Sequence, residues 1–201
     1  LGYFVLDSCG NKKLTALTFI MQNIAANLGG MLTPFGNPQN LYLYSYFNIA
    51  AGEFFKIMAL PFAVAFLLIL GVCLFVKPEK AEVLSAPKKT PPVWRIALYS
   101  ALFVLSVLIV FRVFPYYWGL LAVTALLLIF DFRAVLRVDY GLLFTFCAFF
   151  VFSGNMARIP AVEEFLGGLV ALDPLAFGVL SCQVISNVPS AVLLSKFTSD
   201  Y

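Results

Sequence analysis

The chain has 201 residues, of which 62% are apolar and 11% are charged, with a net charge of +3 and a mean hydropathy of +0.97. Soluble domains average roughly 45–50% apolar and about 25% charged residues, so a water-soluble core of this size is excluded. The composition predicts an all-α polytopic membrane protein with about half a dozen spans of roughly 20 residues each. Because the basic residues lie in short segments and form no single patch, we expect no nucleic-acid partner.

Residues 14–52 are predicted to form one broken helix. An uncharged polar string, Thr33–Asn40, interrupts the apolar sequence where a membrane helix should continue. Backbone that leaves a helix inside a bilayer is stable only where protein or a wet cavity satisfies its polar groups. Before the string, Asn23 and Asn27 are spaced to share one helix face, which either packs on another helix or lines a polar cavity.

The middle of the chain alternates apolar segments with short polar ones. A polar, proline-rich segment, residues 77–92, is predicted to be a cytoplasmic loop, because that orientation places most Lys and Arg residues inside. Residues 160–173, which contain Glu163 and Glu164, are predicted to be an interfacial connector. The predicted spans of this region are residues 54–76, 93–111, 113–130 and 140–157.

Residues 174–199 are predicted to form a re-entrant hairpin that turns around Asn187. A second polar string, Ser186–Ser190, separates two apolar arms, Leu175–Ile185 and Ala191–Phe197, that are each too short to cross a bilayer. Pro38 and Pro189 each suit the first position of the helix that restarts after its string, where a missing N–H does no harm.

Interrupted membrane helices are the best sequence indication of a transporter's binding site. A helix that stops in the membrane leaves carbonyl groups for a cation, and one that starts there presents N–H groups to an anion. We expect no enzymatic activity and no cofactor beyond a coupling Na⁺, because the chain has no His and no visible catalytic constellation. The candidate ligands of substrate or ion are Thr33, Gly36, Asn37, Asn40, Ser186, Asn187 and Ser190, with Gly36, Asn37 and Asn187 as candidate sodium ligands and Asn23 and Asn27 as cavity-lining residues.

Gly29–Asn40, together with Ser186–Ser190 much later in the chain, resembles the ion transporter superfamily. This group includes citrate-transporter-like divalent anion/sodium symporters, arsenite permeases and NhaD-type sodium/proton antiporters. In such families two inverted repeats each supply one hairpin and one broken helix. The resemblance implies that this chain is an internal fragment with the broken helix of the first repeat and the hairpin of the second. Val188 stands where carboxylate symporters typically carry Thr, so arsenite-type and antiporter relatives stay open.

We therefore expect a secondary active transporter in the plasma (inner) membrane of a prokaryote, with several passes. It would move an anion of the carboxylate or oxyanion type, coupled to a cation, by alternating access. The expected partners are a small anionic substrate, membrane lipid and a second copy in a homodimer. Two alternatives stay open: a sodium/proton antiporter whose titrating carboxylate lies outside this chain, and a non-transporting membrane assembly subunit.

Overall fold

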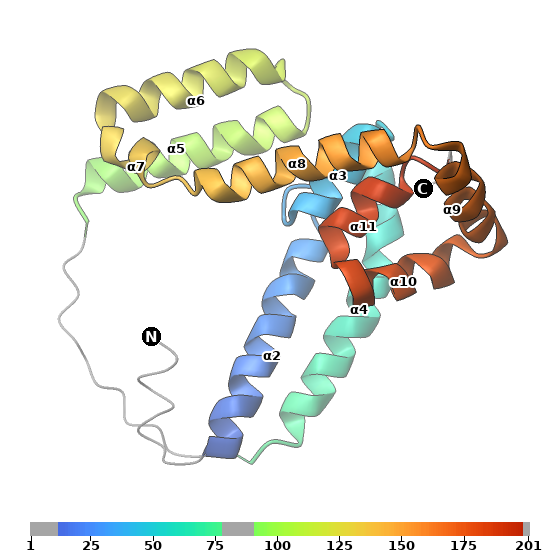
Figure 1. Cartoon of the computed structure of the whole chain (residues 1–201). Coiled ribbons are helices and arrows are strands. Elements are labelled where there is room, and N and C mark those ends of the chain that lie inside the picture. The colour runs from blue at the N-terminus through green and yellow to red at the C-terminus, as the bar shows by residue number, and fades with distance from the viewer. Residues whose placement is uncertain (1–11, 78–90, 199–201) are drawn as a thin grey trace. The chain divides into compact units, whose positions relative to one another are not determined.

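The computed structural model describes residues 12–77 and 91–198, and every regular element within them is a helix (Figure 1). This result and the apolar spans described next confirm the predicted all-α membrane class. Most of the predicted cytoplasmic loop, residues 77–92, lies outside the described residues. The helices are α2 (Lys12–Met31), α3 (Pro38–Tyr46), α4 (Ala51–Leu74), α5 (Val93–Val110), α6 (Tyr116–Phe130), α7 (Phe132–Leu136), α8 (Tyr140–Met156), α9 (Pro160–Leu172), α10 (Pro174–Ile185) and α11 (Asn187–Leu194).

Among the described helices, α4 and α5 are each long and apolar enough to cross a membrane. The pair α8 and α9 passes the same test together but is bent by 98° where the two helices join, so the number of candidate spans is two or three. Helix α6 has 15 residues and α10 has 12, both shorter than the roughly 20 residues that a straight span requires.

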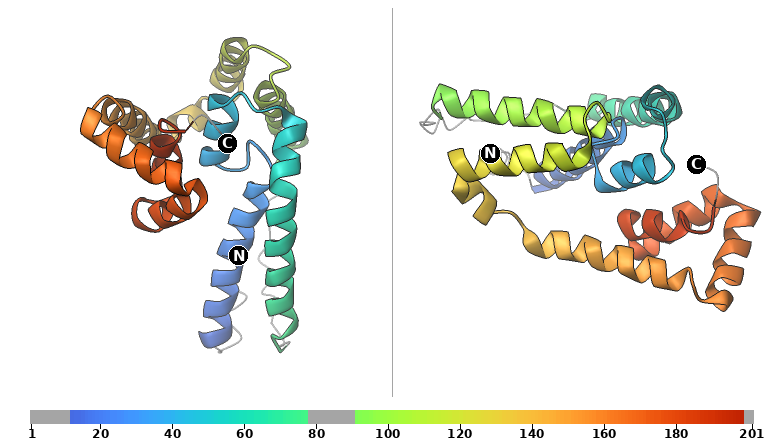
Figure 2. Two further views of the ribbon diagram at one scale, coloured as in Figure 1. Left: turned by 90° about the vertical axis from the view of Figure 1, so that its right-hand side faces the viewer. Right: turned by 90° about the horizontal axis from the view of Figure 1, so that it is seen from above.

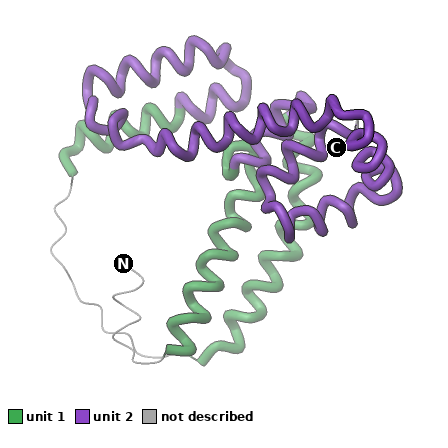
Figure 3. The backbone as a smooth tube through the Cα atoms, in the orientation of Figure 1, with its two compact units in different colours: residues 1–37, 51–104 green, residues 38–50, 105–201 purple. Residues whose placement is uncertain are grey.

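The chain divides into two compact units (Figure 3). Unit 1 contains residues 1–37 and 51–104, and unit 2 contains residues 38–50 and 105–201. In unit 1, α2 and α4 pack alongside each other and run in opposite directions (Figures 1 and 2). Phe35 and Phe103 meet edge to face in the same unit, with ring centroids 6.5 Å apart.

Unit 2 is organised around α11, which packs against α3, α8 and α10. Val192, in the middle of α11, is completely buried, and so are Ser190 in the same helix and Ser195 directly after it. Helix α10 in turn contacts α9. Of the second polar string, Ser190 is therefore enclosed by this packing, whereas Ser186 and Asn187 are exposed.

Proline and aspartate residues set several of the helix boundaries. The Asp139 carboxylate accepts a hydrogen bond from the Leu142 N–H at the start of α8, and Asp173 does the same for Ala176 at the start of α10, both at 2.9 Å. The predicted 113–130 span begins as a helix only at Tyr116, directly after Pro115. Residues 160–172, predicted as a connector, form a regular helix whose first residue is Pro160.

The second arm of the predicted broken helix is shorter than expected. Helix α3 ends at Tyr46 and α4 begins at Ala51, within the range predicted as continuous to residue 52. Asn48 lies between them with a left-handed φ of 54°, which a helix cannot contain. Asn is among the residues that adopt this conformation most readily, so Asn48 explains where α3 ends.

Candidate functional site

The first break, Leu32–Asn37, separates α2 from α3 and lies at the predicted polar string. Pro34 has no N–H to continue the hydrogen bonds of α2, and its ring is fully buried. The Gly36 N–H donates to the Thr33 carbonyl at 3.2 Å and closes a turn inside the break. Helix α3 then starts at Pro38, which takes the predicted first position.

Two glycines allow the backbone of the first break to pack closely against the last turn of α2. A Cβ atom on Gly30 would lie 2.7 Å from the Gly36 carbonyl oxygen and 3.1 Å from its carbonyl carbon. A Cβ atom on Gly36 would overlap the Gly30 carbonyl oxygen and lie 2.6 Å from the Gly30 Cα. The φ of Gly36 lies outside the left-handed region, so glycine is needed here for space and not for an unusual backbone angle.

The two asparagines of α2 lie on one face, as their spacing predicts. The Asn27 side-chain N–H₂ donates to the Asn23 carbonyl at 3.0 Å and to the Asn23 side-chain oxygen at 3.2 Å. Both side chains are exposed within unit 1. Their role as cavity-lining residues stays a prediction.

The second break consists of one residue, Ser186, between α10 and α11. Its backbone angles, φ 74° and ψ 161°, fall in a region that is essentially restricted to glycine and costs a side-chain-bearing residue of order 1–3 kcal/mol. Because Ser186 makes the whole turn, α11 already starts at Asn187. The prediction that Pro189 begins this helix is therefore wrong: Pro189 lies two residues inside it, still within the first turn.

A pair of serine hydroxyls joins the two arms of the hairpin. The Ser181 hydroxyl of α10 donates to the Gly178 carbonyl at 2.9 Å and is also hydrogen-bonded to the Ser190 hydroxyl of α11. Since the Ser181 hydrogen is used on Gly178, Ser190 is the donor between the two hydroxyls. Ser190 is 1% exposed, so this bond lies inside the unit. Ser190 was among the predicted site residues; Ser181 was not.

Helix α3 is bonded to the two residues that directly follow α11, within unit 2. The Tyr42 hydroxyl and the Ser195 hydroxyl are 2.9 Å apart, and the Lys196 ammonium lies 4.4 Å from the centre of the Tyr46 ring. Tyr42 also stacks on Tyr46, with centroids 5.4 Å apart, and lies equally close to Phe150 of α8. The helix that follows the first break is thus attached to the helix that follows the second.

Arg112 holds the C-terminal end of α3. Its guanidinium donates from Nη2 to the Tyr44 carbonyl at 2.8 Å and from Nη1 to the Ile49 carbonyl at 3.3 Å. It also lies 4.5 Å from the centre of the Tyr44 ring. A cation at the C-terminal end of a helix is favourable both for the helix dipole and for the last carbonyls.

The predicted site residues fall into both units. Thr33, Gly36 and Asn37 belong to unit 1, and Asn40, Ser186, Asn187 and Ser190 belong to unit 2. Asn40 lies inside α3 and not in the break, and it is only 7% exposed. That both breaks serve one binding site stays a prediction.

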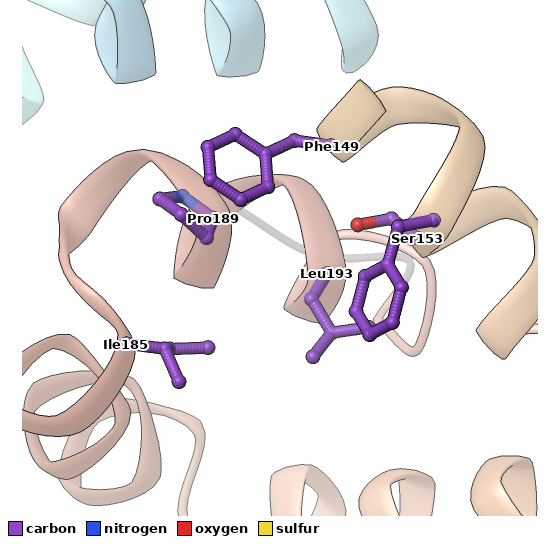
Figure 4. A pocket seen from close by; sticks show the side chains of 6 residues that line it. Phe149, Ser153, Ile185, Pro189 and Leu193 are labelled. Atoms are coloured by element: carbon purple, nitrogen blue, oxygen red, sulfur yellow. The ribbon is translucent and has the colours of Figure 1, made fainter. Parts of the chain in front are cut away.

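A cavity of about 270 Å³ lies in unit 2 between α8 and the hairpin (Figure 4). Ser153 is the one polar residue of its lining, so the cavity does not suit an anion or a bare cation. In the part of the chain that the structure describes, no group of three or more His, Cys, Asp or Glu residues is placed to hold a metal ion. The cavity is lined by Phe149, Phe152, Ser153, Ile185, Pro189 and Leu193.

Known proteins similar to this chain are membrane proteins and transporters. An inner membrane protein of Escherichia coli, YbiR, is 34% identical over 184 residues, which are 89% of this chain and 49% of that protein. An uncharacterized transporter of Methanocaldococcus jannaschii is 33% identical over 183 residues, 90% of this chain and 49% of that protein. The chain thus spans about half the length of the curated relatives it matches, and no solved structure matches it. Residues 1–199 match the family described as citrate transporter (CitMHS), so the chain belongs to the citrate transporter family, within the group that its polar strings resemble.

Proposed function

We propose that the chain forms part of a secondary active transporter that moves a carboxylate or oxyanion across the inner membrane of a prokaryote. Family membership supports transport, and the family's description makes citrate the first anion to test. One relative is named an inner membrane protein and another a transporter, which supports the location and the activity. The long apolar helices α4 and α5 agree with a membrane location.

The observation that carries the proposal is that two apolar helical segments are interrupted at uncharged polar residues. Each interruption creates one helix end with carbonyl groups and one helix start with N–H groups, which suit a cation and an anion respectively. The side chains at the breaks, among them Thr33, Asn37 and Asn187, offer hydroxyl and amide oxygens. Such neutral oxygen ligands suit a hard cation such as sodium.

The polar strings also favour anion transport with sodium over sodium/proton exchange. Neither Thr33–Asn40 nor Ser186–Ser190 contains Asp or Glu. Proton-coupled exchange needs a group that titrates in the membrane, usually a carboxylate or a histidine. An antiporter would have to take that group from residues outside the two polar strings.

Alternating access is proposed to move the two restarting helices together. The contacts of Tyr42 with Ser195 and of Tyr46 with Lys196 attach α3 to α11 within unit 2. A rigid body that carries both helices would keep their N-terminal ends in a constant arrangement while the bound ions are exposed to either side.

The test is uptake by proteoliposomes that contain the full-length protein. Citrate, succinate and sulfate are each supplied outside the proteoliposomes under three conditions: an inward sodium gradient, an inward potassium gradient, and a proton gradient alone. Liposomes without protein are the control. We expect sodium-stimulated uptake of at least one of these anions. Sodium efflux driven only by a proton gradient would favour the antiporter, and no flux under any gradient would favour the non-transporting subunit.

A further inference from the structure

We propose that Gly30 is a positioning residue of the transport site, although it lies in α2 and outside the first break. Its missing side chain allows the break to rest on the end of the helix, and this contact fixes the place of Asn37. The inference depends on the proposed function, because it assigns Gly30 to the site through which the protein binds its substrate or coupling ion.

The contact between Gly30 and the break is made by backbone on both sides. The atoms that a Cβ on Gly30 would meet are the carbonyl oxygen and carbonyl carbon of Gly36, at 2.7 and 3.1 Å. A flexible side chain could turn away from an added methyl group, but a carbonyl moves only with its peptide plane. An alanine at position 30 must therefore displace the break itself.

The displacement would reach Asn37 directly. Asn37 follows Gly36 in the chain, and its side-chain nitrogen lies 3.7 Å from the position of the same Cβ. Ions held by fixed dipoles and a few oxygen ligands require accurate placement, and an error of about 1 Å can reduce activity on the order of a hundred-fold. A shift of Gly36 by part of that distance is enough to weaken binding.

The neighbouring residue provides a matched control. Gly29 lies in the same helix, one position earlier, and is exposed, and a Cβ added there meets nothing within 4 Å. Replacing glycine by alanine within a helix favours the helix by roughly 0.5–1 kcal/mol wherever the space is open. Gly29→Ala therefore reproduces the change in composition and helix propensity without touching the break.

The experiment compares wild-type full-length protein, Gly30→Ala and Gly29→Ala in proteoliposomes. Initial rates of citrate uptake are measured against citrate and against sodium concentration, and thermal unfolding is followed in detergent with and without citrate. Gly30→Ala should raise the KM for citrate or for sodium on the order of ten-fold or more and reduce the citrate-induced rise in Tm. Because the same contact must shift, Gly30→Ala should also lower the Tm without citrate, by less than Gly36→Ala, in which the overlap is closer. Gly29→Ala should keep the wild-type KM and Tm.

Two results would overturn the inference. A Gly30→Ala protein with wild-type KM values would show that the contact does not position the site. A Gly30→Ala protein that fails to fold, or that loses only Vmax and Tm, would show that the contact serves stability alone. If the wild-type protein itself transports nothing, the proposed function has failed; if it transports and Gly30→Ala behaves like Gly29→Ala, only the role of Gly30 has failed.

Discussion

Both breaks interrupt a helical segment, but different interactions stabilise the backbone at each of them. At the first, several residues leave the helix, and the unwound chain is held by close backbone contact between Gly30 and Gly36. At the second, the single residue Ser186 makes the whole turn in a strained backbone conformation. The hydroxyl pair of Ser181 and Ser190 then ties the two arms of the hairpin together.

This difference indicates which substitutions each break tolerates. The first depends on the absence of side-chain volume, so added atoms should be the most damaging change there. The second depends on hydrogen bonds that outweigh backbone strain, so lost hydroxyls should destabilise it and relief of the strain should stabilise it. The predictions below test this contrast, beginning with the largest expected effect.

Gly36→Ala should be the most destabilising of these changes. Its Cβ would overlap the Gly30 carbonyl, and overpacking typically costs roughly 1–3 kcal/mol, so we expect about 3 kcal/mol here, where no side chain can move aside. Thermal unfolding of the full-length protein in detergent should show a clear loss of Tm, whereas Gly29→Ala should show none. Equal Tm values for the two variants would contradict the steric account of the first break.

Arg112→Ala should destabilise unit 2 by about 2 kcal/mol, in the lower part of the roughly 1.5–3 kcal/mol that hydrogen bonds from a charged donor contribute, because Arg112 is exposed. Arg112→Lys should recover only part of this loss, because an ammonium group cannot reach both carbonyls in the geometry of a planar guanidinium. Arg158, which is exposed as Arg112 is, is replaced by Ala as the control. Unchanged stability of Arg112→Ala would mean that α3 does not need this cap.

Ser190→Ala should destabilise the hairpin by about 1–2 kcal/mol, the usual effect of removing a buried hydrogen-bonding hydroxyl. Ser181→Ala should have a similar effect, and the double variant should cost clearly less than the sum of the two, because both changes remove the same bond. Tm values of all four proteins complete the cycle. Additive effects would show that the two hydroxyls do not act as a pair.

Ser186→Gly should have the smallest effect and the opposite sign. Glycine adopts the Ser186 backbone angles without strain, and this gain exceeds its larger loss of chain entropy by about 1 kcal/mol. A higher Tm for Ser186→Gly is the expected result. A lower Tm would mean that the serine side chain stabilises the turn by more than the backbone conformation costs.

Much of the architecture follows from local sequence. Pro34 and Pro38 indicate where α2 must end and where α3 begins, because proline lacks an N–H and is preorganised for a first helical position. Asp139 and Asp173 are recognisable as caps of α8 and α10. The long apolar runs likewise indicate α4 and α5 directly.

The sequence alone could not predict the features that depend on how the chain folds back on itself. The contact of Gly30 with Gly36 depends on how the unwound chain folds back. The contact of Arg112 with α3 joins segments that the intervening helices separate in the sequence. The predicted start of α11 at Pro189 was wrong. Proline favours a first helical position in general, but the strained turn at Ser186 lets this helix begin two residues earlier. Ser181 carries no local signal, since isolated serines are common in apolar helices.

The central claim is that the polar residues of both breaks serve one transport cycle. The most direct test is uptake of citrate, under a sodium gradient, by full-length Asn37→Ala and Asn187→Ala in proteoliposomes. Two exposed amides outside the breaks, Gln22 and Gln183, are replaced by Ala as controls. We predict that both asparagine variants lose most of their uptake at normal yield while both glutamine variants keep it; wild-type uptake by either asparagine variant would contradict the claim.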